Sequence, residues 1–251
     1  VINNLYIKDV EIRTDDDPDA KPYIQDMKIK WLYVNLPSTF ENVQKYLKDC
    51  YNTKIAKIKE FVKLDFPIET KTELLRLQRD LLFSIKENKD YDAMKAISKV
   101  AEAMKVQHAL ELLESQGTTP LLEFMENIIT QAKTTKTKAV RNLAQDINFK
   151  SALILSRNLK ELNIEHPKYD ELKKLLLNHT KDQKIIIFSQ YRDSITSIKN
   201  FINKLPHITA EIFVGQAKKK GIKLTQKEQI NLIERFKKNE FNVLVMSSVG
   251  E

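Results

Sequence analysis

The sequence has few of the residues that serve as metal ligands or disulfide partners. It contains one cysteine, Cys50, so neither an internal disulfide nor a cysteine-based zinc site can form within the chain. The four histidines are widely scattered and show no metal-ligand spacing, so no metal centre is expected. No apolar run approaches the length of a transmembrane helix, and no charged-then-apolar leader precedes Val1. We therefore expect a soluble cytoplasmic protein with no membrane partner.

Motifs that carry catalysis by themselves are also missing. The sequence has no G-x-x-x-x-G-K-[ST] phosphate loop, no serine elbow and no metalloprotease spacing. Asp170 and Glu171 superficially resemble a magnesium-binding acidic box. They follow Pro167 on a predicted helix, however, and such a box requires the end of an apolar strand. Residues 214–221 form a basic loop bounded by glycines, which is not a dinucleotide fingerprint.

The charge is uneven along the chain. Residues 1–37 hold five Lys or Arg against seven Asp or Glu, residues 38–165 hold 21 against 18, and residues 166–251 hold 16 against nine. The last segment therefore has the largest positive excess, which favours a polyanionic partner such as nucleic acid. The alternative interpretation is a general bias toward lysine in the source proteome.

Glycine is almost absent from residues 38–165, where Gly117 is the only one. Helix-period patterns predict helices over about 39–64, 70–88, 91–115, 118–132, 136–146 and 148–162. On the third of these, Ile97, Ala101, Met104, His108 and Leu112 form one apolar stripe, which makes His108 a packed histidine. Ser38 with Glu41 predicts a capping box, Gly117 a helix stop, and Thr118 a cap before Pro120. We predict an all-helical domain over residues 38–165.

Residues 166–251 alternate between helices and short apolar strands. Helices are predicted at about 168–181, 192–204 and from the Thr225 cap to 238, and strands at 184–188, 210–214 and 243–246. This alternation is typical of βαβ units with a parallel sheet. The apolar run Ile185–Phe188 does not alternate, so both faces of that strand are expected to be covered.

The first segment, residues 1–37, contains two candidate strands. Val10–Arg13 is the shorter one. Over residues 27–36, Ile29, Trp31 and Tyr33 recur at period two and predict a second strand before the helical domain.

Small polar residues follow each predicted strand of the last segment. Ser189, Gly215 and Ser247 should therefore line one edge of the sheet, where open α/β sheets bind their ligands. Hydroxyls and backbone N–H groups at this edge can hold successive phosphates, and nearby cations would add to the attraction. Those cations are Arg192, Lys218, Lys219 and Lys220. The alternative is that Ser and Gly are simply common at strand ends.

A second candidate surface lies in the helical domain. Five basic residues there are interleaved with threonines and face only one acid, Asp146. They are Lys133, Lys136, Lys138, Arg141 and Lys150. Ammonium and hydroxyl groups both donate to phosphate oxygens, so the segment suits nucleic acid. A solvated loop and helix face is the equally weighted alternative.

Four segments in this order resemble the branch of superfamily 2 helicases that includes archaeal Hef and eukaryotic FANCM. They are Asp17–Tyr23, His108–Gly117, Phe213–Ala217 and Glu240–Glu251. Lys184–Arg192 is similar to helicase motif IV, and Val243–Glu251 is similar to the first half of motif V. The resemblance spans essentially the whole chain.

The resemblance implies a fold class and domain limits. The fold is α/β, a partial RecA-like parallel sheet interrupted by a large, thumb-like helical insert. Residues 1–37 would hold an inter-domain segment and the first strand of the second RecA-like domain. Residues 38–165 would be the insert, and residues 166–251 the truncated N-terminal part of that second domain.

The resemblance also implies site residues by position. In the family, motifs IV and V contact the phosphates of the tracked strand, and the start of motif V leads toward the nucleotide. The strand contacts carried over are Ser189, Gln190, Arg192, Gly215, Gln216, Ser247 and Ser248. The nucleotide-proximal residues are Gly250 and Glu251. The family usually has threonine at position 247, where this chain has serine, and either hydroxyl can donate to phosphate.

An intact relative would use ATP and Mg²⁺ to remodel forked or branched DNA in repair, associated with the nucleoid. Whether it forms a homodimer or binds clamp or repair partners is open. The phosphate loop, the acidic magnesium box and the arginine-bearing motif VI are not in this sequence, and ATP hydrolysis needs these groups together. The chain alone is therefore expected to bind no cofactor and to hydrolyse no ATP.

Two other functions remain open at this point. Helicases of the RIG-I-like and Dicer groups carry an insert at the same place, so the substrate could be double-stranded RNA. Alternatively, residues 38–165 could be a helical module that docks proteins, with incidental charge.

Overall fold

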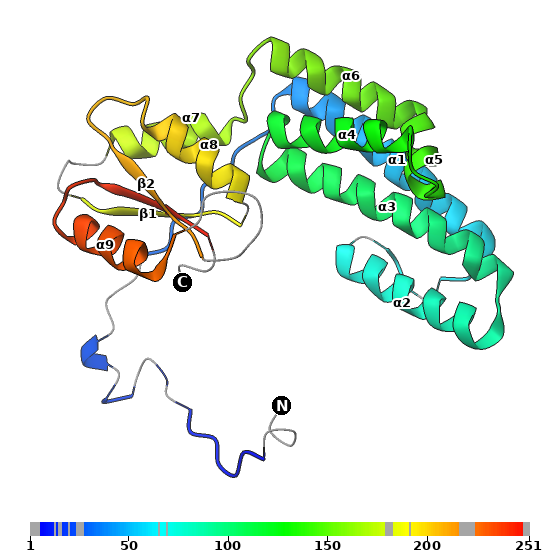
Figure 1. The fold of residues 1–251 in the computed structure, drawn as a ribbon, viewed down its shortest axis with the longest axis horizontal. Helices are drawn as coiled ribbons and strands as arrows, with labels where there is room; N and C mark the ends of the chain where they lie inside the picture. The colour runs from blue at the N-terminus through cyan, green and yellow to red at the C-terminus, as the bar shows by residue number, and fades with distance from the viewer. Residues whose placement is uncertain are drawn as a thin grey trace. The chain divides into compact units, whose positions relative to one another are not determined.

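The structure, a computed structural model, divides into two compact units, residues 1–33 and 34–251. The larger unit contains a helical bundle and a three-stranded α/β part (Figure 1). Among the described helices, none is long and apolar enough to cross a membrane. The described residues are 6–12, 14, 17–19, 21–23, 28–64, 66–68, 70–178, 183–190, 192–215 and 224–247.

The two strands predicted near the N-terminus are not formed in the described residues. Residues 10–12 and 28–37 contain no strand, and the described part of the smaller unit has one 3-10 helix, Lys21–Tyr23. Ile29, Trp31 and Tyr33 are 71%, 77% and 88% exposed. The strand that the period-two spacing of these three side chains predicted is therefore wrong for the described residues. A strand also needs a neighbour for its backbone hydrogen bonds, and the described sheet pairs only three later strands.

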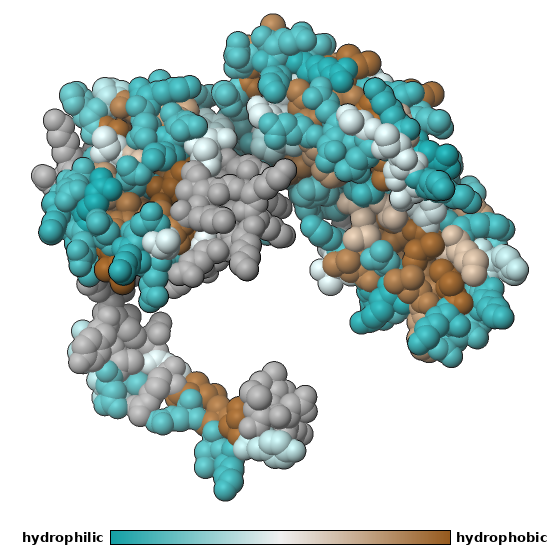
Figure 2. All heavy atoms as spheres, in the orientation of Figure 1, coloured by the Kyte–Doolittle hydropathy of each residue, from teal (hydrophilic) through white to brown (hydrophobic). Residues whose placement is uncertain are grey.

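Six helices build the bundle, close to the predicted positions. They are α1 (Ser38–Phe61), α2 (Lys71–Asn88), α3 (Tyr91–Ser115), α4 (Thr118–Ala132), α5 (Lys138–Gln145) and α6 (Ile147–Glu161). Helix α3 packs against α1, α2, α4 and α5, and one hydrophobic core runs through the bundle. Figure 2 shows apolar atoms gathered over α2. Leu75, Leu82 and Phe83 of this helix are exposed.

The apolar stripe predicted along α3 lies beside the most deeply buried face of the helix and does not coincide with it. Ile97, Ala101 and Met104 are only half-buried. The fully buried positions include Ala96 and Ala103, whose small side chains permit close packing against the neighbouring helices. Because several helices cover α3, one amphipathic stripe does not describe its burial.

Helix caps are confirmed at α9 and wrong at two other helices. Thr225 and Glu228 form the expected capping box at the start of α9 (Gln226–Lys237). At α1, Pro37 takes the N-cap position because its carbonyl accepts from the backbone N–H groups of residues 40 and 41, so Ser38 lies inside the helix. At α4, Gly117 is the N-cap residue, and Thr118 donates its hydroxyl to the carbonyl of Ile164.

The α/β part is a parallel sheet flanked by helices, as predicted. Its elements are α7 (Lys168–Leu177), β1 (Ile185–Phe188), α8 (Arg192–Ile202), β2 (Ala210–Phe213), α9 and β3 (Val243–Met246). The strand order is β1-β3-β2, and both neighbouring pairs are parallel. This arrangement, together with the bundle, matches the predicted fold class.

The expectation that both faces of β1 are covered is wrong for the described residues. Helices α7 and α8 cover one face of the sheet, where Ile185 and Ile187 join the core. Helix α9 covers the other face only at β2 and β3, so Ile186 and Phe188 are 49% and 50% exposed. Of the three strands that the structure describes, the central strand β3 alone is buried along its whole length.

Candidate nucleic-acid interface

The three strands end at the same edge of the sheet. Met246 pairs with Phe188 on one side and Phe213 on the other, so the residues that follow each strand lie together. The Ser189 N–H donates to the carbonyl of Met246 at 2.9 Å, and the Ser247 N–H donates to that of Phe213 at 3.4 Å. The structure therefore brings Ser189, Ser247 and the start of the loop at Gly215 to one edge.

The side chains at this edge differ in accessibility. Gln190 is exposed and Ser189 is half-buried. Ser247 is 5% exposed, and its hydroxyl has no hydrogen-bond partner among the described residues. Arg192 begins α8, directly behind the end of β1, although its side chain is outside the described part. The backbone N–H groups of a helix N-terminus favour an anion, so the position of this helix suits a phosphate.

Several predicted contacts of the edge cannot be placed, because they lie outside the described residues. These are Gln216, Lys218, Lys219, Lys220, Ser248, Gly250 and Glu251.

The basic segment of the bundle forms one exposed stretch at the connection from α4 to α5 and onward into α6. All five of its cations are exposed, and none has an ion-pair partner among the described residues. They are Lys133, Lys136, Lys138, Arg141 and Lys150. We call these five residues the basic surface.

The threonines and the acid of this segment serve the fold. The Thr135 hydroxyl donates to the Thr137 hydroxyl at 3.1 Å and accepts from the Thr137 N–H at 3.2 Å. These two hydrogen bonds shape the turn before α5. Asp146 points inward, where it accepts from Lys54 Nζ at 2.6 Å and caps α6 by accepting from the Phe149 N–H at 3.1 Å. The basic surface thus keeps its positive charge, since the one acid within residues 131–150 is paired with a buried lysine.

Lys54 belongs to a buried ion network that links α1, α3 and α5. Its ammonium lies 3.2 Å from Glu102 Oε2, and Glu102 Oε1 accepts from Lys99 and Asn142. Burial opposes the charge of Lys54, but the hydrogen bond and charge of Asp146 outweigh it and raise the pKa of the ammonium. Burial likewise opposes the Asp146 carboxylate, and bonds from Lys54 and Phe149 outweigh it and lower that pKa.

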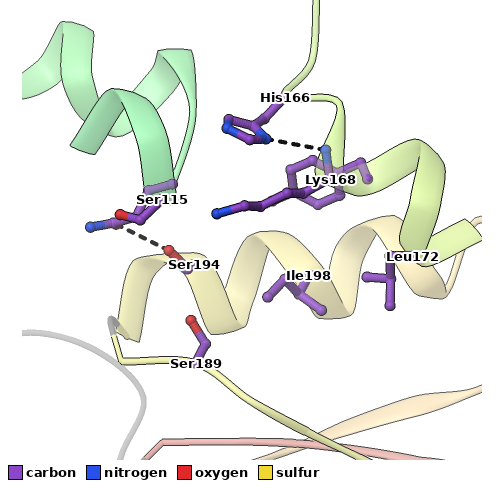
Figure 3. A pocket seen from close by; sticks show the side chains of 9 residues that line it. Ser115, His166, Lys168, Leu172, Ser189, Ser194 and Ile198 are labelled. Atoms are coloured by element: carbon purple, nitrogen blue, oxygen red, sulfur yellow. Dashed lines mark hydrogen bonds between the residues drawn. The ribbon is translucent and has the colours of Figure 1, made fainter. Parts of the chain in front are cut away.

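A small cavity of about 100 Å³ lies where the bundle meets the α/β part. Figure 3 shows the side chains that line it. They come from the end of α3 (Ser115 and Gln116), from the start of α7 and the residues before it (His166 and Lys168), and from the region after β1 (Ser189 and Ser194). Sequence reasoning missed this junction. The one signal for it was the segment His108–Gly117, which the family resemblance singled out without a role.

Two family models match consecutive parts of the chain. Residues 39–163 match the family described as "Putative ATP-dependent RNA helicase, helical bundle". Residues 167–251 match the "Helicase conserved C-terminal domain". Together with the fold, these matches define a superfamily 2 helicase domain that carries a helical bundle.

Individual relatives specify the branch. The crystal structure of the Pyrococcus furiosus Hef helicase domain is 33% identical, with a TM-score of 0.79, over 99% of this chain and 51% of that one. A protein of Methanocaldococcus jannaschii, named a putative ATP-dependent RNA helicase, is 38% identical over 100% of this chain and 31% of its own length. The Fanconi anemia group M protein of Gallus gallus is 25% identical over 100% of this chain and 14% of its own length. The chain belongs to the helicase family of Hef and the Fanconi anemia group M protein.

The chain spans less than a third of the length of these curated relatives. The family implies ATP and Mg²⁺, and the described residues do not fit either group. They contain no cluster of three His, Cys, Asp or Glu side chains that could hold a metal ion. The sequence also has no phosphate loop. No step of ATP chemistry is therefore assigned to these residues.

Proposed function

We propose that this chain is a DNA-binding part of an ATP-dependent DNA helicase that binds and remodels forked or branched DNA. The observation that carries the proposal is that two surfaces suited to phosphates occur in one unit of the fold. One is the sheet edge at Ser189, Gly215 and Ser247, and the other is the basic surface on the bundle.

The two surfaces suit different parts of a fork. The sheet edge offers the half-buried Ser189 hydroxyl and the N-terminus of α8, which together can hold phosphates of one strand. The basic surface offers five exposed cations, without ion-pair partners in the part of the chain that the structure describes, which suits the backbone of a duplex arm. The names of several relatives, such as the ATP-dependent DNA helicases of Neurospora crassa and Schizosaccharomyces pombe, support DNA as the substrate.

Fork binding is expected to exceed binding to plain duplex and to weaken steeply with salt. If the five cations of the basic surface each contact one phosphate, log K should fall against log salt with a slope of about −4 to −5. Fluorescence anisotropy titrations with fork, duplex and single-stranded DNA measure the affinity for each substrate. Repeating them between about 50 and 200 mM salt gives the salt slope. Equal affinity for fork and duplex DNA would contradict the proposed preference for forks.

Reversing charge on the basic surface is expected to weaken fork binding by roughly tenfold and to make the salt slope shallower by about three. The variant is Lys136→Glu with Lys138→Glu and Arg141→Glu. Its matched control reverses three exposed lysines of α1, at Lys45, Lys48 and Lys57, which changes the net charge equally. Equal losses in the two variants would show that only total charge matters and that the basic surface is a solvated face.

Double-stranded RNA is the second candidate, because two relatives and one family model are named for RNA helicases. The same titration with an RNA duplex of matched length separates the two substrates. A protein-docking role for the bundle would instead leave DNA affinity unchanged when the bundle's charges are reversed.

A further inference from the structure

The C-terminal turn of α3 is the meeting point between the bundle and the α/β part. The Ser194 hydroxyl, in the first turn of α8, donates to Gln116 Oε1 at 3.0 Å. The Lys168 ammonium, in the first turn of α7, donates to the carbonyl of Glu114 at 2.9 Å. Both contacts join residues more than fifty positions apart in sequence, so they connect the two modules through space. A cation at the last carbonyls of a helix is also favoured by the helix dipole.

His166 closes this contact from the connection between the modules. Its ring packs edge-on against Phe40 of α1, with centroids 5.6 Å apart, and Nδ1 accepts from the Lys168 N–H at 3.1 Å. It is 3% exposed, and burial together with the charge of Lys168 lowers its pKa to about 4, so the ring is neutral at pH 7. We call Glu114, Gln116, His166, Lys168 and Ser194 the joint.

The joint is directly behind the sheet edge that the proposed function assigns to the single strand. Ser189, which follows β1, and Ser194, which bonds to Gln116, line the same cavity (Figure 3). Ser194 lies two residues after Arg192 in the first turn of α8. The hydrogen bond of Ser194 therefore ties the end of α3 to the helix that begins behind β1.

Gln116 contributes a single side-chain bond to this contact. Its amide oxygen accepts from Ser194, while its buried amide nitrogen has no partner among the described residues. Helix α3 is the long central helix of the bundle and packs against α5, which carries Lys138 and Arg141. An anchor at the end of α3 thus fixes the orientation of the basic surface.

We propose that Gln116, through its hydrogen bond with Ser194, is a positioning residue that holds the basic surface and the sheet edge in the spacing of a forked substrate. The proposal rests on the proposed function. Two surfaces that engage one ligand gain affinity only if their spacing fits the ligand. A loose joint would therefore lower fork affinity while leaving the binding of a single strand, which needs the sheet edge alone, unchanged.

The test compares Gln116→Leu, Ser194→Ala and their double variant in the full chain. Each single variant should lower the ratio of fork affinity to single-strand affinity by roughly tenfold, and the double variant should lose no more than either single one. Gln116→Glu keeps an acceptor for Ser194 and should retain the ratio. Gln107→Leu is the matched control, because Gln107 is half-buried on the same helix and away from the joint.

A distance measurement shows whether the joint itself has loosened. Burial raises the pKa of the Cys50 thiol to about 12, so cysteines introduced at the exposed Lys86 of α2 and Lys227 of α9 can be labelled selectively. The distribution of distances between the two labels should broaden in Gln116→Leu and stay narrow in Gln116→Glu and Gln107→Leu.

An unchanged ratio, or a parallel loss of fork and single-strand affinity, would overturn the positioning role. A narrow distance distribution in Gln116→Leu would also overturn it. Failure of the proposed function is distinguishable, because it appears in the wild-type chain as equal affinity for fork and duplex before any variant is made.

Discussion

Replacing Lys54 by methionine is expected to lower the free energy of unfolding by about 3–5 kcal/mol. Lys54 and Glu102 are 4% and 0% exposed, and the ammonium lies 2.6 Å from Asp146 Oδ2. Methionine fills similar volume, so the loss comes from leaving Glu102 Oε2 and the Asp146 carboxylate without their shared cation. Chemical denaturation measures the change.

Two control variants isolate the buried charge as the cause. Lys57→Met, on the exposed side of α1, should change stability by no more than about 0.5 kcal/mol. Adding Asp146→Asn to Lys54→Met removes the carboxylate that has lost its cation, keeps an oxygen to cap α6 and leaves the Lys99–Glu102 pair intact, so it should restore a large part of the loss. If Lys54→Met alone costs less than about 1 kcal/mol, water reaches the network and the expected penalty for an unpaired buried charge does not apply.

The network also bears on the basic surface. Asp146 is part of the same stretch as Arg141 and Lys150, yet its carboxylate is bonded to Lys54 and to the N-terminus of α6. Without Lys54, this charge would lose its cation, and the positive potential that attracts phosphates would be reduced. The fold therefore supports the proposed DNA contact by keeping an acid turned inward.

The sequence alone was sufficient to predict most helices and the parallel sheet, because their signals are local. The 3.6-residue period of the bundle, the capping pair Thr225 and Glu228, and the apolar run Val243–Met246 each depend on neighbours in the chain. The common edge of Ser189 and Ser247 followed from the alternation of helices and strands.

Features that depend on distant contacts could not be predicted. The exposure of Ile186 and Phe188 depends on how far α9 extends across the sheet, which no local pattern encodes. The same holds for Asp146, whose partner Lys54 is 92 positions away. The joint is a third case, since Gln116 is an unremarkable polar residue until Ser194 is placed against it.

Gly117→Ala is expected to destabilise the chain by about 2–4 kcal/mol, which combines backbone strain with overpacking. Gly117 adopts φ +91° and ψ −161°, a region that residues with a Cβ rarely enter. An added Cβ would also lie 3.0 Å from the Cβ of His166, a contact too short to be met without movement. Thermal and chemical denaturation measure the loss, and Ser115→Ala, two residues earlier on α3, is the control with an expected change near zero.

The cost at Gly117 has two sources that a second variant separates. His166→Gly removes the Cβ that an alanine at 117 would meet, so the double variant should lose less than the sum of the two single losses. Simple additivity would assign the whole effect to the backbone conformation. A loss below about 0.5 kcal/mol for Gly117→Ala would mean that the turn relaxes freely. Because this turn joins α3 to α4 and packs on His166, such freedom would also contradict a rigid joint.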